Sequence, residues 1–221
     1  MLALLLSIAL SPAHAGALNP WGSATSPAAA LINPYVYVTP DAVNPILYGS
    51  AGLAEGVDLY MGYGQVVPQL VPGVGTVELF PRFFVVPQLA LVPHLYWTPG
   101  VDGVIPAAEV HLNLNTDRFA FVANAGWRPL VDRDGFHEGT VPLLLAPELK
   151  LTGRFSAYVE VDPTLSLQGD DPALVLVPGF GATLDRDGRH AVSAGLQIPI
   201  LPDLGVATLG AWYCFTIPAE A

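Results

Sequence analysis

Hydrophobic and polar side chains alternate with a period of two along most of the chain. In residues 154–168, RFSAYVEVDPTLSLQ, the even positions from Arg154 to Gln168 form a polar, partly charged set and the odd positions are apolar. Successive side chains of a β-strand point to opposite faces, so this segment is predicted to be a strand with one apolar and one polar face. Residues 57–67, 107–115 and 118–128 show the same pattern.

The alternation predicts an all-β chain of about twelve strands, with ten as the alternative count, and no helical period appears after residue 15. The expected strands are 34–40, 46–54, 57–67, 75–85, 87–98, 107–115, 118–128, 141–152, 154–168, 173–184, 190–199 and 204–217. The connections alternate between tight turns, such as 54–56 and 115–117, and longer loops, such as 68–75 and 129–140. This asymmetry is typical of a transmembrane barrel, which has short periplasmic turns and longer outer loops.

Composition separates this chain from ordinary soluble domains. Of its 221 residues, 52% are hydrophobic and only 12% are charged, and the mean hydropathy is +0.49. After residue 15 there is no apolar run long enough for a spanning helix. Residues 1–15 are predicted to be a signal peptide, because an apolar stretch (Leu2–Leu10) precedes the small-x-small cleavage pattern Ala13–Ala15. We expect a periplasmic segment at 16–33, a barrel at 34–217 and a tail at 218–221.

Alternation alone fits both a soluble sandwich with its apolar face inside and a membrane barrel with its apolar face outside. Glycines on the polar face and aromatic residues near the strand ends favour the barrel, because glycines relieve crowding inside it and aromatics mark the membrane interfaces. We therefore predict a closed, antiparallel, up-and-down transmembrane β-barrel. Five prolines within the expected strands require bulges, kinks or a shortening of several strands, because proline removes a ladder donor. The expected interface aromatics are Phe83, Trp97, Phe119, Trp127, Phe155, Tyr213 and Phe215.

Taken together, these features resemble the bacterial outer-membrane β-barrel class, although the chain carries no specific family motif. The resemblance implies a location in the outer membrane of a Gram-negative cell. It also implies contact with outer-membrane lipid and with the outer-membrane assembly machinery. The last strand departs from the class, because Phe215 is followed by TIPAEA instead of ending the chain.

The polar faces of the expected strands supply a nearly balanced set of charges and amides for the barrel interior. Either this set forms ion pairs that fill a narrow structural barrel, or it lines a porin-like passage for small polar solutes. The expected lumen-lining residues are Asp58, Glu78, Arg82, His94, Glu109, His111, Asn113, Asn115, Arg118, Asn124, Arg128, Glu148, Lys150, Arg154, Tyr158, Glu160 and Asp162.

Other functions have less support. A net charge of −11 argues against nucleic acid as a partner. The Asp-Arg-Asp-Gly segments at 132–135 and 185–188 are interpreted as turns, because the calcium-loop pattern is incomplete. We expect no cofactor, no metal site and no enzymatic activity. Two alternatives remain: a secreted soluble barrel or sandwich that binds a small apolar ligand, and a barrel enzyme acting on lipid through His94 or His111.

Overall fold

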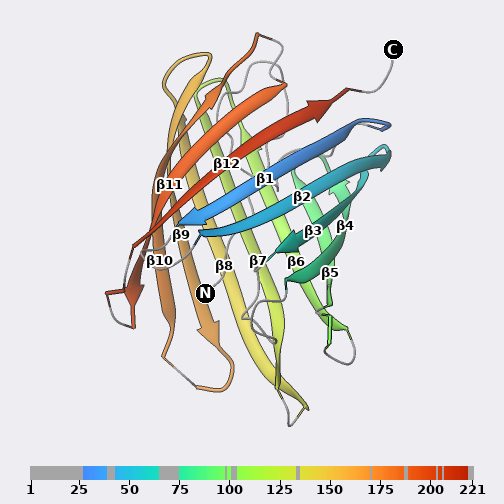
Figure 1. Cartoon of the computed structure of the whole chain (residues 1–221), viewed down its shortest axis with the longest axis vertical. Coiled ribbons are helices and arrows are strands. Elements are labelled where there is room, and N and C mark those ends of the chain that lie inside the picture. Colours follow the sequence, from blue (N-terminus) through green and yellow to red (C-terminus); the bar gives the residue numbers. More distant parts are fainter. Residues whose placement is uncertain are drawn as a thin grey trace.

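The computed structural model is a single ring of twelve antiparallel strands (Figure 1). It describes residues 27–38, 43–64, 75–97, 99–100, 104–132, 135–169, 171–186, 189–202, 204–205 and 207–218, without the side chains of residues 44, 130–132 and 135–138. The strands are β1 (Ala30–Val38), β2 (Val43–Ala54), β3 (Val57–Gly64), β4 (Thr76–Val86), β5 (Leu89–Trp97), β6 (Ile105–Asn115), β7 (Phe119–Asp132), β8 (Gly135–Lys150), β9 (Phe155–Ser166), β10 (Ala173–Thr183), β11 (His190–Leu201) and β12 (Thr208–Ile217). In the described residues, no helix is long and apolar enough to cross a membrane.

Each strand pairs with its sequence neighbours, and β1 pairs with β12 to close the ring. The closing pair runs from Ala30↔Ile217 to Val38↔Leu209. Closure leaves no strand edge without a partner, which is required of a sheet that lies in hydrocarbon. The predicted closed barrel of twelve strands is therefore confirmed.

The two ends of the barrel differ, as the lengths of the connections predict. The tight turns from β2 to β3, from β4 to β5 and from β6 to β7 lie at the upper end in Figure 1, where β12 also ends. At the opposite end, the connections from β3 to β4 and from β5 to β6 are longer, whereas β7 and β8 are separated by only two residues. The predicted signal peptide (1–15), most of the expected periplasmic segment and residues 219–221 of the expected tail lie outside the described residues.

Several strand boundaries differ from those expected, most notably at β1 and at the β7–β8 hairpin. Strand β1 begins at Ala30, ahead of the expected residue 34. The predicted long loop 129–140 is instead mostly strand, because β7 and β8 remain paired as far as Asp132↔Gly135 and form a hairpin that projects from the lower end (Figure 1). Charged and turn-forming residues there resemble a loop in sequence, but cross-strand pairing keeps the backbone extended.

The prolines within the strands are accommodated mainly by their positions in the strand pairing, and not by changes of register. Pairing of β4 with β5 passes from Leu79↔Leu95 to Phe83↔Leu91 with no change of register, which leaves Pro81 and Pro93 opposite each other. Both prolines lack a backbone N–H, so placing them face to face confines the missing donors to one gap in the ladder. The three other expected strand prolines, Pro147, Pro163 and Pro178, are paired with Phe121, Leu174 and Val159. The expected bulges or kinks are therefore not needed at most of these positions.

Candidate functional site: the interior of the barrel

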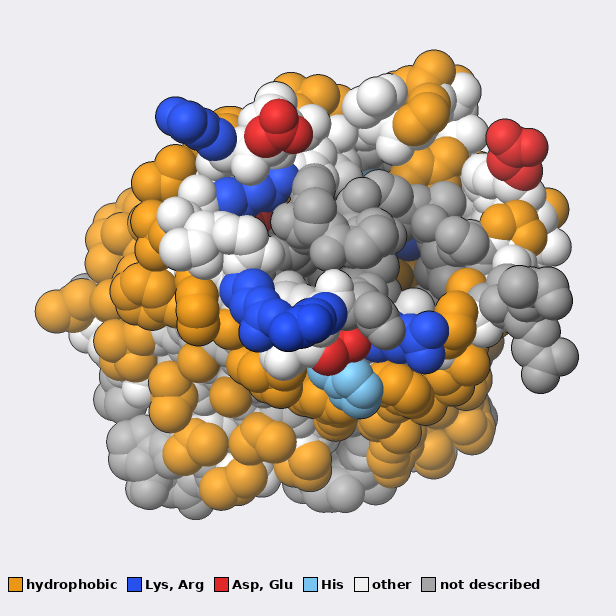
Figure 2. Space-filling model, turned by 90° about the horizontal axis from the view of Figure 1, so that it is seen from above, with side chains coloured by type: hydrophobic (Ala, Val, Ile, Leu, Met, Phe, Trp, Pro, Cys, Tyr) orange, Lys and Arg blue, Asp and Glu red, His pale blue; other side chains and the backbone are white. Residues whose placement is uncertain are grey.

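The polar face of each strand points into the barrel and the apolar face points outward. In β9, Glu160 is 1% exposed, whereas its neighbour Val159 is 44% exposed. Figure 2 shows apolar side chains covering the outer wall when the barrel is viewed from its short-turn end. This orientation contradicts the soluble alternative, which requires the apolar face to be buried. A closed barrel with a polar interior and an apolar wall is the architecture of proteins that cross the outer membrane with strands.

The expected lumen-lining residues divide into three groups by exposure. The buried members are Asp58, Glu78, Arg82, His94, His111, Asn124, Glu148, Tyr158, Glu160 and Asp162. Glu109, Asn113, Arg128 and Lys150 are partly buried, and Asn115 is exposed at the end of β6. Arg118 and Arg154 differ from expectation, because they lie in the turns before β7 and β9 and are exposed. In both segments the alternation of polar and apolar residues begins one residue before the strand does, so the sequence pattern wrongly placed these two arginines on the inner face.

A buried ion pair joins β3 to β4. Arg82 donates from Nε to Asp58 Oδ1 at 2.8 Å and from a terminal nitrogen to Asp58 Oδ2 at 2.6 Å. Both side chains have no exposed surface. The Arg82 guanidinium also lies 4.5 Å from the Tyr60 ring centroid and 5.1 Å from that of Phe84. Two parallel hydrogen bonds and two aromatic contacts hold this arginine in one orientation.

A second network of polar side chains extends across β2, β4 and β5. Tyr48 donates from its hydroxyl to Glu78 Oε2 at 2.9 Å, and Glu78 Oε1 lies 2.9 Å from His94 Nδ1. The ring of Phe80 stacks on that of His94 with centroids 4.8 Å apart. The hydrogen bond to Glu78 and the stacking on Phe80 fix the plane of the His94 ring.

The network continues on β6 and β7. His111 Nε2 lies 2.8 Å from Glu109 Oε2, and a terminal nitrogen of Arg128 lies 3.7 Å from Glu109 Oε1. The same arginine nitrogen donates to the Tyr96 hydroxyl at 2.8 Å. Glu109 and His111 are two residues apart in one strand, so both side chains point into the barrel.

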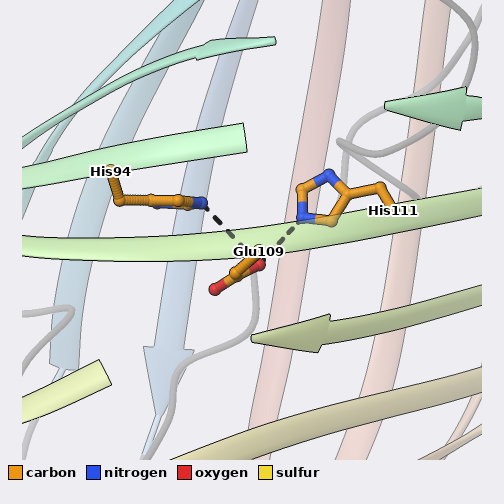
Figure 3. Close-up of side chains that lie close together, drawn as sticks. All are labelled: His94, Glu109 and His111. Atoms are coloured by element: carbon orange, nitrogen blue, oxygen red, sulfur yellow. Dashed lines mark hydrogen bonds and ion pairs between the residues drawn. The ribbon is translucent and has the colours of Figure 1, made fainter. Parts of the chain in front are cut away.

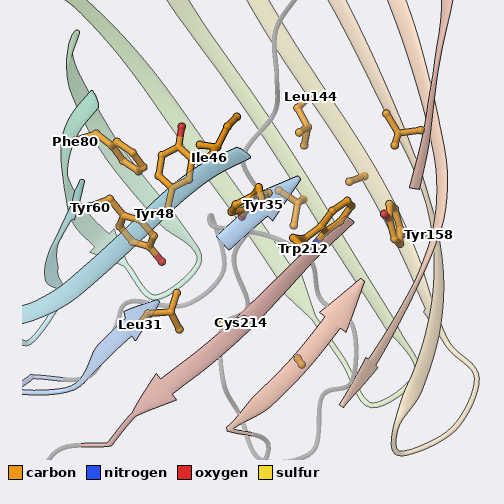
Figure 4. Packing of buried hydrophobic residues seen from close by; sticks show 14 of the residues in the cluster. Leu31, Tyr35, Ile46, Tyr48, Tyr60, Phe80, Leu144, Tyr158, Trp212 and Cys214 are labelled. Carbon is orange, nitrogen blue, oxygen red and sulfur yellow. The ribbon is translucent and has the colours of Figure 1, made fainter. Parts of the chain in front are cut away.

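An arc of aromatic side chains lines part of the interior, and of its members only Tyr158 was among the expected lumen-lining residues (Figure 4). Ring centroids are 6.2 Å apart for Tyr158 and Trp212, 6.1 Å for Trp212 and Tyr35, and 5.5 Å for Tyr35 and Tyr48. Tyr48 then contacts Phe80 at 6.4 Å. The alternation pattern could have found these residues, because Phe80 lies between the inward positions Glu78 and Arg82. Aromatic residues are commonly assigned to an apolar face, which conceals such positions.

The interior wall formed by β7 and β8, between the two ends of the aromatic arc, carries smaller side chains. Ala120, Val122 and Ala146 are buried there. The carboxylate of Glu148 lies on this wall, and those of Glu160 and Asp162 follow Tyr158 on the inner face of the adjacent strand β9. One oxygen of each, namely Glu148 Oε1, Glu160 Oε2 and Asp162 Oδ1, is buried and has no hydrogen-bond partner among the described residues.

The expected interface aromatics lie on the outer wall or at its ends. The exposed members are Phe83, Trp97, Phe119, Trp127 and Phe155. Phe119 and Phe155 are the first residues of β7 and β9, and Trp97 is the last residue of β5. Tyr213 and Phe215 are partly buried near the end of β12, where the His190 ring stacks on Phe215 with centroids 4.8 Å apart.

Basic residues concentrate at the short-turn end of the barrel. Five of the eight Lys and Arg residues lie in or beside these turns, and Figure 2 shows cationic side chains around this opening. They are Arg118, Lys150, Arg154, Arg186 and Arg189. The Lys150 ammonium donates to Asn115 Oδ1 and to the Thr116 carbonyl oxygen, so this cation is held beside the β6–β7 turn.

The turn from β10 to β11 supports the turn interpretation of the second Asp-Arg-Asp-Gly segment. Asp185 accepts hydrogen bonds from the backbone N–H of Arg189 at 3.1 Å and of His190 at 2.8 Å. Slight burial acts to raise the pKa of Asp185, but these backbone N–H groups outweigh it and lower the pKa from its ordinary value. The side chains of the first segment lie outside the described residues.

No protein-family model matches this chain, and no curated protein matches it. Solved structures with a similar fold include the KdgM porin in complex with disordered oligogalacturonate, at a TM-score of 0.61 and 9% identity over 85% of this chain and 99% of that one. The NanC porin has a TM-score of 0.59 and 11% identity over 84% and 98%. An outer membrane channel from Pseudomonas putida F1 has a TM-score of 0.57 and 9% identity over 90% and 98%. The chain therefore has the fold of outer-membrane porins and channels, as the sequence analysis predicted.

Proposed function

We propose that this barrel is a passive outer-membrane channel for small polar solutes and that its interior favours cations over anions. The carboxylate wall of β8 and β9 carries the proposal, because Glu148, Glu160 and Asp162 each bury an oxygen that has no hydrogen-bond partner among the described residues. A buried carboxylate oxygen is costly unless a proton, water or a cation reaches it. A hydrated passage along this wall would meet that requirement.

The distribution of charge supports the preference for cations. Inside the barrel, Asp58 is neutralised by Arg82, and Glu109 lies near Arg128. On the short-turn rim, Arg118, Arg154, Arg186 and Arg189 are exposed turn residues, whereas Lys150 is partly buried two residues from Glu148 in β8 and offsets part of its charge. The ion pairs of the described residues include none with Glu160 or Asp162. Rings or rows of carboxylates in a pore attract cations and repel anions. Acidic solutes such as the oligogalacturonate bound by the KdgM porin would therefore be disfavoured here.

Conductance measurements test this proposal directly. The chain refolded into planar bilayers should give steady conductance with no voltage or ligand trigger, and a KCl gradient should give a reversal potential that indicates preference for K⁺. Replacing the three carboxylates together (Glu148→Gln, Glu160→Gln and Asp162→Asn) should remove most of that preference. Glu55→Gln is the matched control, because Glu55 is exposed in the β2–β3 turn.

The competing structural function makes a different prediction. If the aromatic arc and the ion pairs fill the barrel, correctly folded protein will show no conductance. Folding is checked by the change in gel mobility on heating that transmembrane barrels show, so that an absence of conductance caused by misfolded protein is not counted. The fold relatives are named as porins and channels. We keep the sequence-based expectation that the chain is not an enzyme.

A further inference from the structure

Two histidines and one glutamate converge inside the barrel, on strands β5 and β6. Figure 3 shows the rings of His94 and His111 approaching the carboxylate of Glu109 from either side. His94 Nε2 lies 3.7 Å from Glu109 Oε2, and His111 Nε2 lies 2.8 Å from the same oxygen. Each residue offers one ligand atom, and these three atoms lie within 4.8 Å of one another.

We propose that His94, Glu109 and His111 bind a divalent transition-metal ion, with Zn²⁺ the best match, on the inner wall of the barrel. In a tetrahedral zinc site the bonds are about 2.0–2.1 Å long, so neighbouring ligand atoms lie about 3.4 Å apart. The two separations from Glu109, 2.8 and 3.7 Å, lie on either side of that value. Small side-chain rotations would bring all three ligand atoms to bonding distance of one ion.

The residues around the cluster orient it for metal binding. His94 Nδ1 contacts Glu78 Oε1 at 2.9 Å, which leaves Nε2 as the atom that faces Glu109 and His111. Tyr48 in turn donates to the other oxygen of Glu78. A carboxylate that contacts the distal nitrogen of a histidine is the usual support of a metal-ligating histidine, because it fixes the ring and increases the basicity of the ligand nitrogen.

The donor set selects among metals. Two imidazole nitrogens and one carboxylate oxygen suit Zn²⁺, Cu²⁺, Ni²⁺ or Co²⁺, whereas Ca²⁺ and Mg²⁺ prefer sites made of oxygen. Three protein ligands leave the fourth coordination position to water or a solute. Glu109 keeps 12% of its side-chain surface exposed, so the cluster is not sealed from its surroundings. Arg128, 3.7 Å from the other Glu109 oxygen, would limit the accumulated negative charge and favour a single bound ion.

The same three side chains could instead form only a hydrogen-bonded network, and a binding experiment separates the two. The chain is produced without a polyhistidine tag, refolded in detergent micelles, treated with chelator and titrated with Zn²⁺ alone by calorimetry. We expect one equivalent to bind, and Ca²⁺ in large excess should not displace it. Titration with Co²⁺ should give the visible absorption of a four-coordinate cobalt site.

Variants then assign the site. His94→Gln and His111→Gln should each weaken Zn²⁺ binding by more than about 100-fold, and Glu78→Gln, which removes only the support of His94, by about 10–100-fold. His190→Gln is the matched control and should bind as the original chain does, because His190 is the first residue of β11 and contacts Tyr213, not the cluster. If either cluster variant fails to fold, Glu109→Gln tests the same site.

The proposal is overturned if the original chain binds no stoichiometric Zn²⁺, or if binding survives both histidine substitutions. Binding is measured in micelles and requires no conduction, so its outcome is independent of the proposed channel. If the barrel conducts, Zn²⁺ added to the bilayer chamber should alter the conductance of the original chain and leave that of His111→Gln unchanged.

Discussion

Removing either partner of the Arg82–Asp58 pair should destabilise the barrel more than removing both. Both side chains are fully buried and joined by two short hydrogen bonds. Arg82→Met leaves an unpaired carboxylate in the interior, and Asp58→Leu leaves an unpaired guanidinium. Each single variant should lose about 3–5 kcal/mol of unfolding free energy, which is the usual cost of breaking a buried pair.

The double variant Asp58→Leu/Arg82→Met removes both ions together. What it still loses is mainly the two contacts of Arg82 with the Tyr60 and Phe84 rings, about 0.5–1 kcal/mol each. Its total loss should therefore be about 1–2 kcal/mol, at least about 1 kcal/mol less than that of either single variant. Restoration of stability by a second substitution at a contacting residue is the signature of a coupled pair.

Equilibrium urea unfolding of the refolded barrel, followed by tryptophan fluorescence, measures these differences from the midpoints at constant slope. Arg118→Met is the matched control, because Arg118 is exposed in a turn and its loss should change stability by less than about 0.5 kcal/mol. If the double variant is destabilised by the sum of the two single losses, the two side chains do not act as a pair and the reasoning is refuted.

Three further predictions concern the wall, the packing of the interior and a turn. Val159→Arg, on the lipid-facing side of β9, should lower the unfolding free energy in lipid vesicles by about 2–4 kcal/mol. Leu151→Arg, in the exposed β8–β9 turn, should lower it by less than about 1 kcal/mol. Equal losses would contradict a membrane-facing wall. Gly179→Ala places a Cβ about 2.2 Å from the Tyr158 ring and should lower the unfolding free energy of the barrel by about 1–3 kcal/mol. Adding Tyr158→Val should restore part of that loss. No recovery would show that the clash lies elsewhere. Because folding lowers the pKa of Asp185, its contribution to stability is present above its ordinary pKa and is lost as the pH falls through the lowered value. The urea midpoint of Asp185→Asn should therefore fall less at acid pH than that of the original chain. An unchanged pH profile would count against the turn hydrogen bonds.

The sequence was sufficient to predict the architecture because the side chains of a strand alternate between two faces, so the residue types with a period of two indicate what each face contacts. Where Val159 alternates with Glu160, the apolar set must face one medium and the charged set another. The absence of a spanning helix, the low content of charged residues and the alternating lengths of the connections then left a closed membrane barrel as the best account. The strand number and the direction of the two faces were therefore predictable from local information.

The tertiary structure decided which inward side chains meet. Arg128 and Tyr96 are 32 residues apart, and Glu78 and His94 are 16 apart, so no local pattern connects them. Their contacts depend on the register of neighbouring strands and on the tilt that closure imposes, which are properties of the whole ring.

The same reason explains the errors and the omission. Pairing across strands sets three features that the sequence did not predict. They are the exposed turn positions of Arg118 and Arg154, the extension of β7 and β8, and the opposed pair Pro81 and Pro93. The convergence of His94 on Glu109 and His111 was likewise invisible, because the alternation specifies a face but not the height at which strands align. The sequence by itself determined which face of each strand points into the barrel, and closure of the twelve strands determined which of the inward side chains lie close enough to interact.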